Sequence, residues 1–113
     1  MKKMAFVGFD HRVDERDLEE QSFNCWFVWK FEEEVVINRV YLEMHFFEGE
    51  KFQVWIEVAK QENEWKSLVK GMEVEKNLRI SIKKDVVMQH IRVRGLSRMK
   101  ENLRVNDIWV DYE

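Results

Sequence analysis

Apolar and polar residues alternate with a period of two along much of this chain. Between Lys51 and Ala59 the sequence reads KFQVWIEVA, so one face of the segment is apolar and the other carries Gln53, Trp55 and Glu57. This alternation is typical of a half-buried β-strand. It also turns the Trp55 indole toward solvent, where a large apolar surface calls for a partner that covers it.

Similar strand-like segments recur along the chain, and no segment keeps an apolar period of 3.6 residues. About eight strands are predicted, over residues 4–9, 26–31, 37–44, 51–59, 65–69, 78–82, 89–94 and 105–112. Between them, Asp10–Ser22 is interpreted as a polar loop or at most one helical turn, and Glu32–Glu34 as a turn. Gly71 lies in a further connection and is the residue best able to adopt a positive φ there. The pattern predicts an all-β antiparallel sandwich.

The inward positions of these strands form the predicted core, which comprises Val40, Leu42, Phe52, Val54, Ile56, Ile80, Ile91, Val93, Ile108 and Val110. With 113 residues and a 45% hydrophobic share, the chain is long enough for one core and too short for two. We therefore expect a single domain over residues 1–113.

Charge and hydropathy exclude several partners. The net charge of −3 argues against nucleic acid, which normally binds a basic surface. No segment approaches the roughly 18 apolar residues of a membrane span. The apolar stretch after the first lysines is too short for an export signal. We therefore expect a cytoplasmic protein by default, or else a module of an exported one.

Cys25 is the only cysteine and cannot form an internal disulfide. Its apolar neighbours Trp26 and Phe27 indicate a buried, inert thiol. A disulfide between two copies of the chain is the alternative.

Catalytic motifs are absent from the sequence. There is no G-x-S-x-G, the four serines have no neighbouring histidine, and four glycines are too few for a glycine-rich phosphate loop. His11, His45 and His90 lack the spacing of zinc ligands and are interpreted as structural or surface residues. The chain is therefore not expected to be an enzyme.

From Trp26 onward the strand segments follow a familiar order. The segments are WFVWKFEEEVVINRVYLEM, FQVWIEVAKQENEWKSLVKG, QHIRVRG and NLRVNDIWVDYE. This order resembles the galactose-binding-like jelly roll of the discoidin or coagulation-factor type C family, whose I-x-x-V-x-L strand is matched by Ile37–Leu42. The resemblance implies a jelly-roll sandwich that recognises sugars, lipid head groups or proteins through the loops at one end.

The same resemblance implies a calcium site closed by an acidic residue and backbone carbonyls. Asp107 stands before the last apolar pair, Ile108 and Val110, and Asp10 and Asp14 belong to the predicted first loop. Calcium prefers six to eight oxygen ligands, which such acids supply. The alternative is an acidic loop that binds only water.

A carbohydrate site is predicted at the HFFEGE turn. Phe46 and Phe47 are adjacent and cannot both point into one core from a strand, so one ring is expected to be exposed and able to stack on a sugar. His45, Arg98 and Asn102 would add polar groups for the hydroxyls. The alternative is that one ring closes the end of the sandwich and the other packs locally.

A protein interface is the rival function. Trp55 and Trp109 share the outward parity, and they could form a platform on one sheet that buries against a second protein or a second copy of the chain. Alternatively, long Lys and Arg side chains shelter both indoles.

Overall fold

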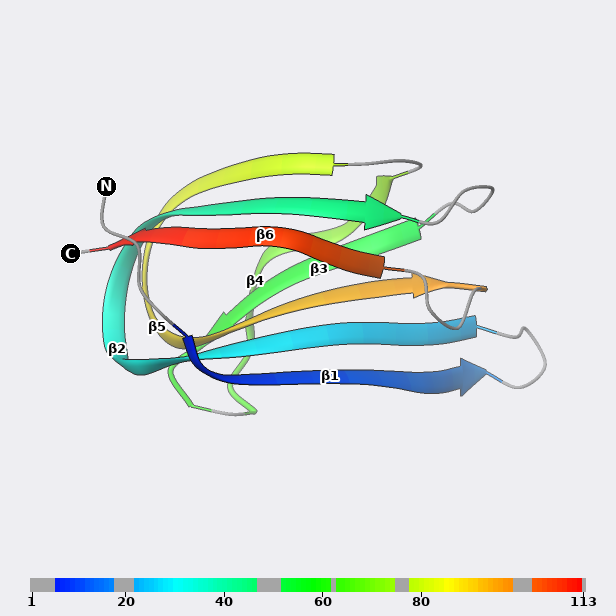
Figure 1. The fold of residues 1–113 in the computed structure, drawn as a ribbon, viewed down its shortest axis with the longest axis horizontal. Coiled ribbons are helices and arrows are strands. Elements are labelled where there is room, and N and C mark those ends of the chain that lie inside the picture. Colours follow the sequence, from blue (N-terminus) through cyan, green and yellow to red (C-terminus); the bar gives the residue numbers. More distant parts are fainter. Residues whose placement is uncertain are drawn as a thin grey trace.

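The computed structural model describes residues 6–17, 22–46, 52–61, 63–74, 78–98 and 103–112, which form one curled antiparallel sheet (Figure 1). Its strands are β1 (Phe6–Asp17), β2 (Ser22–Phe46), β3 (Phe52–Ala59), β4 (Lys66–Val74), β5 (Leu78–Ser97) and β6 (Leu103–Tyr112). The described part of the chain contains no helix that is long and apolar enough to span a membrane.

β2 and β5 each belong to both layers of the sandwich. The first half of β2 pairs with β1 and with the second half of β5, which continues to β3 and β4. The second half of β2 pairs with β6 and with the first half of β5. The result is a five-stranded layer and a three-stranded layer. Figure 1 shows both long strands bending at the same end of the molecule, on the left of the view.

The described residues form six strands, so the prediction of about eight is wrong. The predicted strands 26–31 and 37–44 are the two halves of β2, and 78–82 and 89–94 are the two halves of β5. Glu32–Glu34 is not a turn but the exposed outer side of the bend, where the β2–β5 register shifts between Lys30 and Val35. Both strands bend together and stay paired, so charged residues can occupy the bend without ending the strand.

The predicted loop Asp10–Ser22 is also corrected. β1 continues to Asp17, with Asp10 opposite Val28 and Asp14 opposite Asn24. Backbone hydrogen bonds to β2 form this strand whatever its side chains are. Because β1 is at one end of the strand order, its polar sequence is typical of a charged edge strand that discourages pairing with other chains.

The buried side chains of the two layers form one cluster. The predicted core residues Val40, Leu42, Val54, Ile56, Ile91, Val93 and Val110 are all at most 1% exposed. Ile80 and Ile108 are half-buried and pack against the cluster, and the Phe52 side chain lies outside the described ones. The predicted core is therefore confirmed for the positions that the structure describes.

Cys25 is fully buried, as predicted. Its Sγ lies 3.9 Å from the Leu103 carbonyl oxygen and donates a weak hydrogen bond to it, which connects β2 to the start of β6. A thiol with no exposed surface cannot reach a second copy of the folded chain. The alternative of a disulfide between two copies is therefore wrong for the native fold.

Candidate functional site

A buried carboxylate organises the outer face of the five-stranded layer. Glu57 is only 6% exposed although its position on β3 faces away from the core. Its Oε1 accepts hydrogen bonds from the Nε of Arg92 at 3.1 Å and of Arg94 at 2.6 Å, and its Oε2 accepts one from Arg92 Nη2 at 3.1 Å. Charge-assisted bonds of this kind compensate for the desolvation of all three groups.

Two tryptophans cover the two guanidinium groups. Arg92 Cζ lies 4.2 Å from the ring centroid of Trp65, and Arg94 Cζ lies 4.9 Å from that of Trp55. Both distances are within the range of cation–π attraction. Trp55, Glu57, Trp65, Arg92 and Arg94 together are called the Trp-Arg cluster below.

Gly71 makes room for Trp55 on the neighbouring strand. It has a φ of +55°, as the sequence predicts, but it lies inside β4 rather than in a connection. Met72 is opposite Val54 and Val69 is opposite Ile56, so Gly71 belongs to a β-bulge. A Cβ at Gly71 would lie 3.4 Å from the Trp55 ring. Trp55 is therefore in contact with both neighbouring strands.

Trp55 faces outward, as the alternation predicts. Its indole is sheltered by the Arg94 side chain, which was the alternative to a platform for a second protein. The burial of Glu57 was missed. The signal was present, because WIE in β3 and HIRVR in β5 place opposite charges on the outward faces of two strands. The sequence does not show that these two strands are neighbours, with Glu57 opposite Arg92.

A pocket of about 300 Å³ adjoins the Trp-Arg cluster. It is lined by Asn24, Gln53, Trp55, Arg94 and Leu96. Asn24 Oδ1 is buried and has no hydrogen-bond partner. Among the described residues, Arg94 forms its only hydrogen bond through Nε, so its terminal nitrogens are unpaired. An unpaired acceptor and unpaired donors therefore line the same pocket, which we call the amide pocket.

The amide pocket lies toward the end of the sandwich that is opposite to the bends. Asn24 is near the start of β2, Leu96 near the end of β5 and Gln53 near the start of β3. Figure 1 shows these three strand ends on the same side, the right of the view. A ligand in the pocket would therefore be close to the connections at this end.

Part of the predicted sugar site reaches this same end. His45 and Phe46 are the last residues of β2, Arg98 directly follows β5 and is exposed, and His45 itself is half-buried. Phe47, Asn102 and the side chain of Phe46 lie outside the described ones. The topology thus brings His45, Phe46 and Arg98 to one end, and none of them lines the amide pocket.

The predicted calcium ligands are distributed over both layers. Asp10 and Asp14 lie on β1, in strand rather than loop, whereas Asp107 is an exposed residue of β6 opposite Glu43. Within the described ranges, no group of three or more His, Cys, Asp or Glu side chains could hold a metal ion. The calcium site stays a prediction.

Trp109 lies on the outer face of the three-stranded layer. It stacks on Tyr41, its register partner on β2, with a centroid distance of 5.0 Å and an interplanar angle of 18°. Both rings are half-buried. Because Trp55 belongs to the other layer, the two tryptophans do not share a platform, and that part of the interface prediction is wrong.

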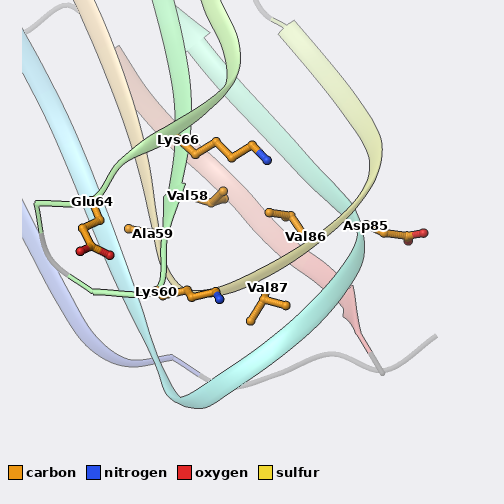
Figure 2. Close-up of a pocket in the computed structure, with 8 residues that line it drawn as sticks. All are labelled: Val58, Ala59, Lys60, Glu64, Lys66, Asp85, Val86 and Val87. Atoms are coloured by element: carbon orange, nitrogen blue, oxygen red, sulfur yellow. The ribbon is translucent and has the colours of Figure 1, made fainter.

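A second pocket, of about 460 Å³, lies near the bend of β5 (Figure 2). It is lined by Val58, Ala59, Lys60, Glu64, Lys66, Asp85, Val86 and Val87. Figure 2 shows the Asp85 carboxylate pointing away from the other lining residues. The lining combines aliphatic groups with charges and includes no aromatic or amide side chain, which makes it less suitable than the amide pocket for orienting a sugar.

No protein-family model matches this sequence, and no curated protein matches it either. Solved structures do match. The CBM32 module of AlyQ, in complex with 4,5-unsaturated mannuronic acid, has a TM-score of 0.66 at 10% identity and covers 98% of both chains. A pectin-binding carbohydrate-binding module has a TM-score of 0.63 at 14% identity and covers 96% of this chain and 91% of its own.

A third match is chitosan-binding module 1 from a chitosanase/glucanase of Paenibacillus sp. IK-5. Its TM-score is 0.61 at 13% identity, over 93% of this chain and 76% of its own. The chain therefore has the galactose-binding-like β-sandwich fold of these modules. The fold that the sequence resemblance implied is confirmed.

Proposed function

We propose that this chain is a non-catalytic carbohydrate-binding module and that the amide pocket is its sugar site. The observation that carries the proposal is that two kinds of unpaired group line the same pocket. These are Asn24 Oδ1, a buried acceptor without a partner, and the terminal nitrogens of Arg94. Sugar hydroxyls donate and accept hydrogen bonds at once, so they can satisfy both groups. Gln53 adds an exposed amide, and Trp55 adds an apolar wall.

The fold supports the proposal without deciding it. The similar structures are modules described with a mannuronic acid derivative, pectin and chitosan. A fold can host many functions, so the chemistry of the pocket has to carry the argument. The non-catalytic part rests on the sequence, which has no nucleophile motif.

His45 and Arg98 form the outer part of the proposed site, and the sequence predicts that Phe46, Phe47 and Asn102 belong to it as well. His45 and Arg98 lie at the same end of the sandwich as the amide pocket, so an oligosaccharide could extend from the pocket toward them. In this arrangement the pocket holds one sugar unit, and the residues at the end of the sandwich contact the next units.

Calorimetric titration with oligogalacturonate, oligomannuronate and chitosan oligosaccharides tests the proposal. Asn24→Ala and Gln53→Ala should each weaken binding by about tenfold, which corresponds to one hydrogen bond of about 1.4 kcal/mol. Arg98→Ala should weaken binding of the longer oligosaccharides more than that of the shorter ones. The matched control is Tyr41→Ala on the other layer, which should leave binding unchanged.

The proposal is contradicted if the intact protein binds none of the three saccharides at millimolar concentration. It is also contradicted if Asn24→Ala and Gln53→Ala bind as the parent does while Tyr41→Ala does not. Thermal melting of each variant separates lost binding from lost folding.

A further inference from the structure

The outer face of the three-stranded layer has an ordered arrangement of charge. Its outward residues form three rows across β6, β2 and β5, namely Asp107–Glu43–Arg79, Trp109–Tyr41–Ser81 and Asp111–Arg39–Lys83. These positions alternate with buried or half-buried core residues such as Val40, Leu42 and Val110, so the rows face away from the core. None of the nine residues is buried as a whole, and Asp111 is half-buried with its Oδ1 atom inside the surface and without a hydrogen-bond partner.

The two edges of this face carry opposite charges. β6 contributes the carboxylates of Asp107 and Asp111, and β5 contributes the cations of Arg79 and Lys83. In the middle row, the β6 edge carries the large side chain of Trp109 and the β5 edge carries the small side chain of Ser81. The face is therefore complementary to itself in both charge and size.

We propose that this face binds a second copy of the chain about a two-fold axis that runs parallel to the strands and over β2. Such an axis places β6 of one copy over β5 of the other within the same row. Asp107 then faces the partner's Arg79, and Asp111 faces the partner's Lys83. The Trp109 indole lies over the partner's Ser81, where a small side chain leaves room for it. An isologous interface repeats each contact twice.

The alternative two-fold axis, perpendicular to the strands, is disfavoured. It would place Asp107 against the partner's Asp111, and Arg79 against the partner's Lys83. Like charges that face each other across an interface are destabilising. Both axes keep the strands of the two copies aligned, as sheets that pack face to face usually are, so the charges decide between them.

The parallel axis has one cost. Arg39 and Glu43 on β2 lie close to the axis and face their own copies. Glu43 is partly neutralised by Arg79 of its own chain, at 3.6 Å. Arg39 is exposed and has no ion pair among the described residues, so two like charges meet at the axis.

The face is also smaller than the roughly 800 Å² per partner of a standard interface, since three strands of about ten residues cover roughly 500 Å². The dimer should therefore be weak.

Sedimentation equilibrium up to about 1 mM protein, where millimolar affinities become visible, tests the proposal. The parent should dimerise reversibly, and added salt should weaken the dimer. Asp107→Lys and Arg79→Glu should each weaken self-association by about tenfold or more, because each variant places two like charges opposite each other at both copies of the contact between positions 107 and 79. An equimolar mixture of the two variants should form a heterodimer with nearly the parent's affinity, because lysine then faces glutamate and arginine faces aspartate.

Arg39→Gln sharpens the test, since removing the like charges at the axis should strengthen the dimer. A parent that stays monomeric over the whole concentration range overturns the proposal, and so does a mixture that fails to recover dimerisation while both variants melt as the parent does. The amide pocket is on the other layer, so saccharide binding by these variants should be unchanged. Dimerisation and sugar binding can therefore fail independently.

Discussion

The two outer faces of the sandwich use the same residue types to opposite effect. Each carries a tryptophan and a glutamate that forms an ion pair with an arginine of a neighbouring strand. On the five-stranded layer, Glu57 and Arg94 have side chains that are 8% and 19% exposed, whereas Glu43 and Arg79 on the three-stranded layer are 32% and 74% exposed. An outward tryptophan is therefore not by itself a binding surface. Whether neighbouring side chains cover the indole decides whether it can contact a partner.

The position of each strand in its layer explains the difference. Trp55 is on β3, which has β4 on one side and β5 on the other, so Gly71 and Arg94 contact it from both directions. Trp109 is on β6, whose pairing in the described structure is with β2, and it stacks on Tyr41. A central strand has neighbours on both sides that can cover its aromatic residue, whereas the pairing described for β6 is on one side only.

The largest expected effect is the loss of the carboxylate that holds the Trp-Arg cluster. Glu57→Ala leaves two largely buried guanidinium groups without their counterion and should lower the free energy of unfolding by about 3 kcal/mol. Glu43→Ala, the matched change on the open face, removes an exposed ion pair and should cost less than about 1 kcal/mol. Urea denaturation measures both. Equal losses of unfolding free energy for the two variants would contradict the difference in burial between the two ion pairs.

A smaller effect is expected from the two tryptophans. Trp55→Ser should cost about 2 kcal/mol, because it removes a cation–π contact and uncovers Arg94 and Gly71. Trp109→Ser should cost about 1 kcal/mol, the scale of one stacked aromatic pair at a partly exposed site. Thermal melting of dilute protein, where any dimer is dissociated, gives the comparison. A larger loss for Trp109 than for Trp55 would reverse the assignment of closed and open faces.

The smallest effect concerns the bulge beneath Trp55. Gly71→Ala should cost about 1 kcal/mol, because its φ of +55° is unfavourable for a residue with a Cβ. The added Cβ would make ordinary contact with Trp55, so the cost should be the same in a Trp55→Ser background. Relief of the cost in that background would show that crowding against the indole, and not backbone conformation, is responsible.

The sequence predicts the fold class and the core well, because both depend on alternation within single strands. Val54, Ile56, Ile91 and Val93 are buried as their spacing indicates. Strand ends are predicted poorly. Glu32–Glu34 and the polar residues of β1 look like connections, but pairing with distant segments keeps them extended. Local polarity cannot distinguish a paired bend or an edge strand from a turn.

The candidate site was predicted less well than the fold. His45, Phe46 and Arg98 reach the predicted end of the sandwich, which follows from strand order. Asn24, Gln53 and Arg94 were not identified as binding residues, because each comes from a different strand and only the register brings them together. Likewise, whether Trp55 is covered depends on Arg94, which is far away in the sequence. Periodicity gives the direction of a side chain but not its neighbours.

The most direct test of the proposed function is to map the bound sugar on the protein by NMR. Backbone amide shifts would be followed during titration with oligogalacturonate, oligomannuronate and chitosan oligosaccharides. Under the proposed function, at least one of them should shift the amides around Asn24, Gln53 and Arg94 most strongly, followed by Arg98, and should leave the amides of Tyr41 and Trp109 unmoved. Shifts centred on Tyr41 and Trp109, or on Lys60 and Val87 in the second pocket, would contradict it, as would no shift with any of the three saccharides.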